Sequence, residues 1–210
     1  MIRLAVSIVS AAVVCCMSLC WTADTAFAGS ALPQLKETVD KVIEVSKDKN
    51  LKKPSRAVER RKAIRKLISE RFDFEEMAKR SLAIYWQQRT PQERAEFVPL
   101  YTDLLERSYM KKIEDYDDEK VVYIDEVLDG SYAVVKTRIV TRRNGEIPVD
   151  YRLLAKGKKW EIYDVSIEGV SVVNNYRSQF NKIIRTSSYQ DLVKKMKNKQ
   201  AEELFEEKDR

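Results

Sequence analysis

The chain has 210 residues, of which 44% are apolar and 34% are charged. This composition supports a hydrophobic core and excludes a disordered chain, and the length suits one domain with a helical elaboration. The formal net charge is +6, with basic residues spread along the chain. Charge alone is therefore compatible with an anionic membrane surface or simply with solubility.

The first 28 residues have the organisation of a signal peptide. Arg3 gives a positive start, residues 4–19 form an apolar run, and Ala26-Phe27-Ala28 is a small-x-small cleavage pattern. We expect cleavage before Gly29 and export of the mature chain. The alternative is an uncleaved anchor, although the apolar run is short for a membrane span of about 20 residues.

The mature chain lacks the residue types of common catalytic and metal chemistry. The sequence has no histidine, and Cys15, Cys16 and Cys20 would all be removed with the signal peptide. None of the three has the preceding residues that lipoprotein processing requires. The usual ligands for zinc, copper and haem are then missing, as are Ser–His and Cys–His nucleophile pairs. Carboxylates at 115–119 are more typical of a solvated loop than of an acid/base pair, so we expect no cofactor, no metal and no enzyme activity, with a carboxylate hydrolase as a distant alternative.

The first half of the mature chain is predicted to be helical. Apolar residues recur every three or four positions at 31–47, at 55–71 and behind Asp73 and Thr90. Asp73 and Thr90 each precede an acidic residue by three positions, the pattern of a capped helix start. The 55–71 segment carries seven basic residues, which usually marks a solvated helix face and otherwise an anionic contact surface. Pro99 is expected to bend or break the last helix.

From Lys120 the apolar pattern changes to alternation, which predicts strands at 120–128, 132–141, 147–154 and 160–167. Asp129-Gly130, Asn144-Gly145 and Lys156-Gly157 lie between them as hairpin turns. We therefore predict an α+β fold, in which an antiparallel four-stranded meander sheet is covered by several amphipathic helices and encloses an apolar pocket.

The last predicted hairpin and the segment behind it carry the most specific expectations. A two-residue turn at Lys156-Gly157 places Leu153 opposite Trp160 and Tyr151 opposite Ile162, whereas the Asn144-Gly145 register stays open. After a turn at Glu168-Gly169, Ser171 is expected to cap an amphipathic helix over 170–185.

Asp164 is the one carboxylate that alternation places on the apolar face of the last strand, beside Trp160 and Ile162. A carboxylate in such a position needs a partner. Arg177 on the following helix is the expected one, either in a structural pair that ties helix to strand or in binding a headgroup.

Several motifs resemble the MlaC, or toluene-tolerance auxiliary, family of periplasmic phospholipid-shuttle proteins from Gram-negative bacteria. The motifs are FDFEEMA at Phe72–Ala78, Trp86, ERAEFVPLYTDLL at Glu93–Leu105, VDYRL at Val149–Leu153 and, most sharply, KWEIYDVSIEGVSVVNNYRSQF at Lys159–Phe180. Weaker similarity extends back to about Leu32. The sequence departs from the family pattern at Ala83, where glycine is frequent, and at Pro99.

The resemblance implies a periplasmic carrier that holds phospholipid acyl chains between its sheet and its helices. It implies exchange with an inner-membrane ABC transporter complex bearing an MCE-type subunit and with an outer-membrane lipoprotein complex, which maintains outer-membrane lipid asymmetry. It implies neither enzyme activity nor a metal. Export disfavours nucleic-acid binding despite the basic helix, and we expect a monomer. A hopanoid-associated carrier of the same family and a ligand-free interaction module are the alternatives.

On this basis residues 29–199 are expected to form a lipid-binding domain, made of a helical part at 31–118, a sheet at 120–167 and a closing helix at 170–185. Residues 200–210 are expected to be a charged, frayed tail. Ten apolar residues are predicted to line the lipid site, although strict alternation places Val165 on the opposite face from Ile162. They are Phe97, Tyr101, Leu104, Val149, Tyr151, Ile162, Val165, Val173, Tyr176 and Phe180.

Overall fold

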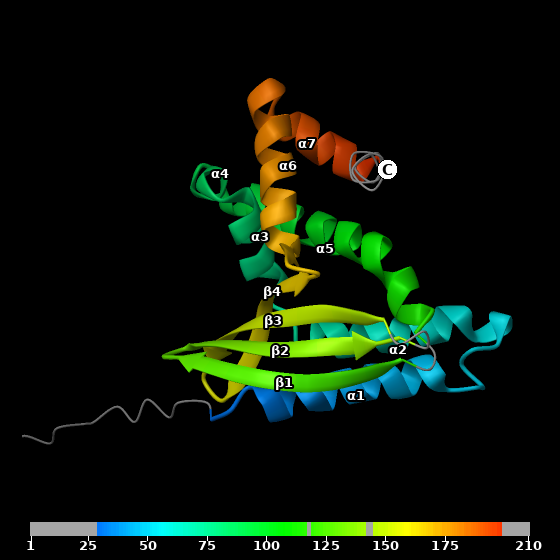
Figure 1. Cartoon of the computed structure of the whole chain (residues 1–210). Coiled ribbons are helices and arrows are strands. Elements are labelled where there is room, and N and C mark those ends of the chain that lie inside the picture. Colours follow the sequence, from blue (N-terminus) through cyan, green and yellow to red (C-terminus); the bar gives the residue numbers. More distant parts are fainter. Residues whose placement is uncertain (1–28, 117–118, 142–144, 199–210) are drawn as a thin grey trace, which may run out of the picture.

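The computed structural model describes residues 29–116, 119–141 and 145–198, so the predicted signal peptide and C-terminal tail lie outside the described residues. Helices and strands are segregated along the chain: a helical first part is followed by a meander of strands and then by two helices (Figure 1). In chain order the elements are α1 (Leu32–Lys47), the short 3-10 helix η1 (Pro54–Arg56), α2 (Ala57–Ser69), α3 (Phe74–Leu82), α4 (Ile84–Gln87), α5 (Pro91–Glu114), β1 (Lys120–Asp129), β2 (Tyr132–Val140), β3 (Glu146–Lys156), β4 (Lys159–Ile167), β5 (Val170–Ser171), α6 (Val172–Thr186) and α7 (Tyr189–Lys197).

The sheet is an antiparallel meander in the order β1-β2-β3-β4-β5, which confirms the predicted α+β class. It has five strands where four were predicted, because the chain turns back after β4 and pairs Ser171 with Ser166. The turn at Glu168-Gly169 has positive φ angles of 50° and 81°, a conformation in which glycine is favoured. Ser171 then accepts a hydrogen bond from the backbone N–H of Asn174 and caps α6, as predicted.

The predicted register between β3 and β4 is wrong. Lys156 pairs with Lys159, so Gly157 and Lys158 form the turn, and Leu153 lies opposite Ile162 rather than Trp160. The register also shifts within the hairpin. Leu153 pairs with Ile162 but its neighbour Arg152 pairs with Asp164, so Tyr163 is an extra residue in β4. This bulge brings Val165 opposite Tyr151, on the same face as Ile162. Strict alternation had placed it on the other face.

The helix that Asp73 opens is interrupted after nine residues, between α3 and α4. Asp73 accepts a hydrogen bond from the N–H of Glu76, which confirms the predicted cap. The interruption lies at Ala83, whose φ of 50° and ψ of −121° are not helical. An L-residue with a side chain rarely adopts such angles, which explains why glycine is favourable at this position.

Replacing Ala83 by glycine is therefore expected to stabilise the protein. Relief of backbone strain should raise the free energy of unfolding by about 1 kcal/mol in urea titrations. Ala95→Gly is the matched control, since Ala95 is exposed inside α5 with helical geometry and should lose about 1 kcal/mol. A loss of stability in both variants would show that Ala83 is not strained.

The long helix α5 is continuous from Pro91 to Glu114, so the break expected at Pro99 does not occur. Thr90 and Glu93 close a reciprocal capping box at its start, as the sequence pattern predicts. Phe97 and Tyr101 on either side of Pro99 are fully buried, and this packing holds the helix together despite the missing donor.

The buried residues form two separate cores. One lies among α3, α4, α5, α6 and α7, which stand together on one side of the sheet in Figure 1. The other lies between the sheet and α1, which runs behind the strands in the same view. Val165 packs against both, so the bulged strand β4 joins the two cores.

Candidate functional site

Six of the ten predicted lining residues lie inside the helical core rather than along an open space. Their side chains are at most 2% exposed. They come from α5 and α6 and are Phe97, Tyr101, Leu104, Val173, Tyr176 and Phe180.

The aromatic rings of this group pack against one another. The centroid of Phe97 lies 5.7 Å from that of Phe180, with the rings edge to face, and Tyr101 lies 5.7 Å from Tyr176 in the same arrangement. Ser81 donates a 2.9 Å hydrogen bond to the Tyr101 hydroxyl within the core. Contacts of this kind fill the interior with side chains, so in this structure these six residues are packing residues of the helical core.

The other four predicted residues belong to the sheet. Val149, Tyr151, Ile162 and Val165 lie on the face that α1 covers, here called the inner face. Val149 and Ile162 are buried, whereas Tyr151 and Val165 are only half-buried. The structure therefore divides the predicted lining between two cores, and contact of any of these residues with a lipid stays a prediction.

The helices cover the inner face unevenly. At the end next to the β3–β4 turn, inner-face residues such as Ala133, Leu153 and Trp160 are at most 1% exposed and pack against the start of α1. Toward the other end several apolar side chains stay half-buried, although Val149 among them is buried. We call this second set the open half of the inner face: Val121, Tyr123, Ile139, Ile147 and Tyr151.

The side chains of the neighbouring helices show the same incomplete burial. Val39, Val42 and Ile43 of α1 are half-buried, as are Tyr109 and Ile113 near the end of α5. The Ser46 hydroxyl donates to the carbonyl of Ile113 over 3.3 Å, so these two helix ends meet. An apolar surface that the chain's own helices cover only in part is a candidate site for an apolar ligand.

Sequence reasoning missed Val121, Tyr123, Ile139 and Ile147 as candidates. The register of the β2–β3 hairpin assigns their face, because Thr137 pairs with both Tyr123 and Val149, and Ile139 with both Val121 and Ile147. The strand alternation could have identified these residues, because it assigns each one to a face of the sheet once the register is known.

Among the five residues of the open half, only Tyr123 and Tyr151 carry a polar group, the phenol hydroxyl. Burial raises the pKa of Tyr151 to about 12, with a smaller contribution from Tyr116. Burial also raises the pKa of Tyr123 well above its ordinary value, and Asp40 and Tyr151 add to the effect. Both phenols are therefore neutral hydrogen-bond donors at physiological pH. The buried Tyr123 hydroxyl has no hydrogen-bond partner among the described residues, and such groups are rare without a ligand or water to satisfy them.

Removing the Tyr123 hydroxyl is expected to stabilise the protein in its ligand-free state. Tyr123→Phe eliminates a buried polar group without a partner and should raise the free energy of unfolding by about 1 kcal/mol. Tyr101→Phe should do the reverse and cost about 1 kcal/mol, because it leaves the buried Ser81 hydroxyl unpaired. Chemical denaturation measures both variants side by side. An equal loss of stability in the two would contradict the conclusion that the Tyr123 hydroxyl is buried without a partner.

The expected pairing of Asp164 with Arg177 is wrong. The carboxylate of Asp164 accepts hydrogen bonds from Arg152 at 2.8 Å, from the Ser171 hydroxyl at 2.6 Å and from the backbone N–H of Val173 at 3.0 Å. Arg177 instead donates to the carbonyl of Arg80. The β-bulge is the physical reason, since it turns Asp164 toward Arg152 and the start of α6. Asp164 thus fixes β5 and α6 to the sheet.

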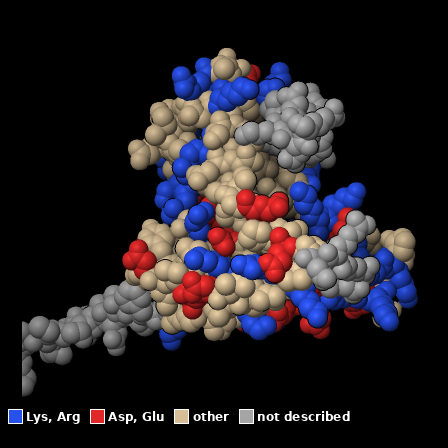
Figure 2. Space-filling view, in the orientation of Figure 1, with Lys and Arg blue, Asp and Glu red and all other residues tan. Residues whose placement is uncertain are grey.

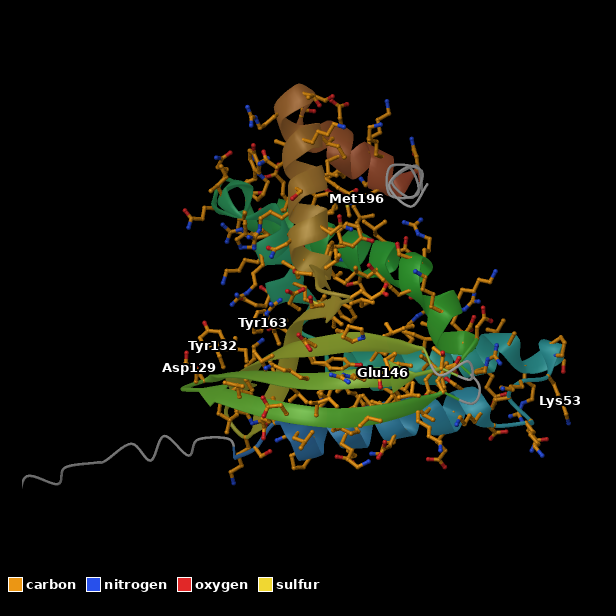
Figure 3. All side chains as sticks on the ribbon, in the orientation of Figure 1. Lys53, Asp129, Tyr132, Glu146, Tyr163 and Met196 are labelled. Atoms are coloured by element: carbon orange, nitrogen blue, oxygen red, sulfur yellow. The ribbon has the colours of Figure 1, made fainter. Side chains whose placement is uncertain are left out.

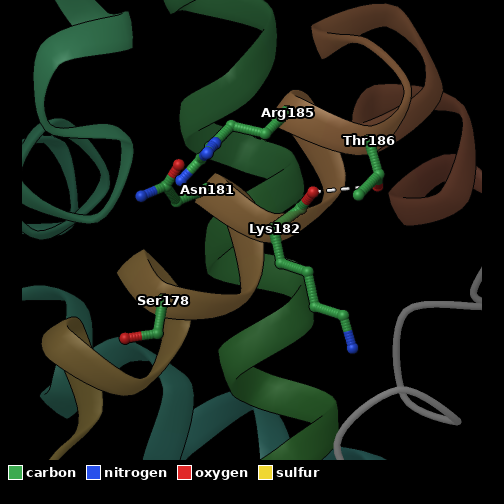
Figure 4. Close-up of a pocket in the computed structure, with 5 residues that line it drawn as sticks. All are labelled: Ser178, Asn181, Lys182, Arg185 and Thr186. Atoms are coloured by element: carbon green, nitrogen blue, oxygen red, sulfur yellow. Dashed lines mark hydrogen bonds between the residues drawn. The ribbon is translucent and has the colours of Figure 1, made fainter.

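Two hollows on the molecular surface lie away from the open half. One, with a volume of about 370 Å³, is lined by Ser178, Asn181, Lys182, Arg185 and Thr186 on the outer side of α6 (Figure 4). The other, of about 380 Å³, lies between α5 and α7 and includes Glu93, Glu96 and Lys197. Both are rich in polar and charged side chains, which suits neither for an acyl chain.

Within residues 29–116, 119–141 and 145–198, no group of three or more His, Cys, Asp or Glu side chains is placed to hold a metal ion. None of the helices that the structure describes combines the length and the apolarity needed to cross a bilayer.

The apolar face of the sheet is covered only in part by the helices, so the molecule is an α+β domain with a partly uncovered apolar surface. Comparison with known proteins supplies the family. The family model described as "MlaC protein" matches residues 36–198, so the chain belongs to the MlaC family, which confirms the resemblance found in the sequence.

Two relatives illustrate the similarity. The chain is 21% identical over 129 residues to the intermembrane phospholipid transport system binding protein MlaC of Haemophilus influenzae, an alignment that spans 59% of this chain and 60% of the relative. The solved structure of a phospholipid-binding protein from Ralstonia solanacearum, in complex with a phospholipid, superposes with a TM-score of 0.73 and 22% identity. It covers 82% of this chain and 98% of that one and shows the same fold.

Proposed function

We propose that this protein is a periplasmic phospholipid carrier without enzyme activity, which holds acyl chains against the open half of the inner face. The observation that carries the proposal is that Val121, Tyr123, Ile139, Ile147 and Tyr151 stay half-buried together on the inner face, whereas Ala133, Leu153 and Trp160 near the β3–β4 turn are buried. Family membership and a structural relative solved with a phospholipid support the choice of ligand.

The energetics favour such a site. Exposing a methylene group to water costs about 0.8 kcal/mol, so a phospholipid with two acyl chains cannot cross an aqueous compartment unaided at a useful rate. The open half offers aliphatic and aromatic surface with neutral phenols, and no ionised side chain is among its five residues. Acyl chains would complete the cover of this face, and the phenols would donate hydrogen bonds to ester or phosphate oxygens.

The proposal includes a shuttle role between membranes. The predicted signal peptide supports a periplasmic location, and the name of the Haemophilus influenzae relative describes an intermembrane transport system. We propose exchange with an inner-membrane ABC transporter complex that bears an MCE-type subunit and with an outer-membrane lipoprotein complex. Net movement of phospholipid between these complexes would maintain outer-membrane asymmetry.

The test is a pair of neighbouring substitutions on β2. Ile139 and Val140 are both half-buried and β-branched, but they point to opposite faces of the sheet, and only Ile139 belongs to the open half. Ile139→Glu should reduce the phospholipid retained after detergent-free purification by more than about tenfold, because a carboxylate is costly to bury against acyl chains. Val140→Glu should retain lipid like the unaltered protein.

Lipid is measured by mass spectrometry of an organic extract, and thermal unfolding confirms that both variants are folded. Equal retention in the two variants would contradict the placement of the lipid on the inner face. Absence of lipid from the unaltered protein would favour a ligand-free interaction module, and a hopanoid in the extract would indicate the hopanoid-associated branch of the family.

A further inference from the structure

The strongest charge concentration in the described part of the chain lies around the connection between α1 and α2. Residues 47–66 contain ten Lys or Arg and two acidic residues, a net charge of +8, whereas the whole chain carries +6. This segment lies at one end of the molecule, with Lys53 at its outer tip in Figure 3. Lys and Arg gather at the same end in the space-filling view of Figure 2.

Some of these cations have structural roles. Arg61 pairs with Glu114 at 2.9 Å and Arg65 pairs with Glu106, so two arginines of α2 fix this helix to α5. Arg56, at the end of η1, pairs with Glu59 of α2. All three arginines thus have acidic partners, and loss of Arg61 or Arg65 would disturb the contact between α2 and α5 rather than a docking surface.

A second set of cations is free of salt bridges within the described ranges. It includes Lys49 and Lys53 in the connection and Lys62 on α2. Lys62 follows Val58 by four residues, so the two side chains share the outward side of α2, away from the buried Ile64. We call Lys49, Lys53, Val58 and Lys62 the basic tip.

Val58 gives the tip an apolar point. Its side chain is 84% exposed, the highest value among the exposed large apolar residues of the described part. Lysines are flexible point charges without the fixed geometry of arginine, and this suits a diffuse layer of negative charge better than a shaped protein surface. Exposed apolar residues next to lysines are the combination that interfacial membrane binding uses.

From these observations we infer that the basic tip docks the protein onto a membrane surface that contains anionic phospholipid. The lysines would contact headgroup phosphates and Val58 would enter the boundary between headgroups and acyl chains. The inference goes beyond the proposed function, since docking does not require a cargo.

Co-sedimentation with vesicles tests the inference. At low ionic strength the purified protein should bind vesicles of phosphatidylcholine mixed with phosphatidylglycerol and bind phosphatidylcholine vesicles weakly. Each lysine near an anionic surface contributes roughly fivefold to partitioning, so the double variant Lys53→Gln, Lys62→Gln should bind about 30-fold more weakly. Val58→Ser should weaken binding about fivefold, and roughly 1 M salt should remove the preference for phosphatidylglycerol.

The matched control is Lys158→Gln with Lys159→Gln, which removes the same charge from the β3–β4 turn, where both lysines are exposed. This variant should bind within about threefold of the unaltered protein. Equal weakening in both double variants would show an effect of net charge alone and overturn the inference. Failure of the unaltered protein to prefer phosphatidylglycerol vesicles would also overturn it, as expected if the tip contacts an acidic protein instead.

Failure of the docking inference can be distinguished from failure of the proposed function. Ile139→Glu alters the open half but not the basic tip, so this variant should sediment with the vesicles like the unaltered protein. Its loss from the vesicle pellet would show that sedimentation reports uptake of cargo, and would overturn the assignment of docking to the tip.

Discussion

Replacing Asp164 by alanine is expected to lower the free energy of unfolding by about 3–5 kcal/mol, because it removes a buried carboxylate that three donors share. Arg152, the Ser171 hydroxyl and the N–H of Val173 would all lose their acceptor at the point where α6 meets the sheet. Urea denaturation followed by circular dichroism measures the loss.

The matched control is an acidic residue of the same sheet in an exposed ion pair. Asp125 lies 3.6 Å from Lys136, and both side chains are about half exposed (51% and 48%). Asp125→Ala should therefore change the free energy of unfolding by no more than about 0.5 kcal/mol. An equally small change in Asp164→Ala would contradict the role of Asp164 in attaching α6 to the sheet.

The second large effect is expected at the centre of the helical core. Phe97 is fully buried and its ring lies 5.7 Å from Phe180, 6.1 Å from Tyr189 and 6.2 Å from Tyr101. Phe97→Ala should cost about 3–5 kcal/mol of unfolding free energy, because the cavity it leaves is surrounded by rings that cannot all move into it.

An aromatic residue on the outer side of the sheet provides the comparison. Tyr132 is 43% exposed and contacts the ring of Tyr163 at 6.0 Å. Tyr132→Ala should cost about 1 kcal/mol or less, measured by the same denaturation experiment. If Phe97→Ala were as mild, the helical core would be loosely packed and its residues would again be candidates for direct lipid contact.

Features that depend on local chemistry could be predicted from the sequence. The caps at Asp73, Thr90 and Ser171 are confirmed because each cap requires only a side-chain acceptor and an N–H three residues later. The change from helical periodicity to alternation near Lys120 likewise locates the start of the sheet correctly.

The register of β4 could not be predicted, because its cause lies far away in the chain. The backbone N–H of Ile162 donates to Arg71, and its carbonyl accepts from the N–H of Asp73. These bonds pair the segment between α2 and α3 with the free edge of β4 next to the bulge. No pattern within the hairpin itself contains this contact, so strict alternation assigned Asp164 and Val165 to the wrong faces.

The candidate site was only partly predictable for a related reason. Periodicity identifies apolar residues that face inward, but not which of them the helices leave uncovered. Phe97 and Tyr176 have the apolar periodicity expected of residues that line a site, yet both are tightly packed, whereas Ile139 and Ile147 have ordinary strand alternation and stay half-buried. The difference lies in the tertiary packing, which periodicity does not encode.

The most direct test of the account is a native mass spectrum of the protein purified from a bacterial host without detergent. A phospholipid held against the open half predicts a complex heavier than the polypeptide by the mass of one phospholipid, released as an intact lipid on collisional activation. A spectrum that contains only the mass of the bare polypeptide would contradict the carrier function.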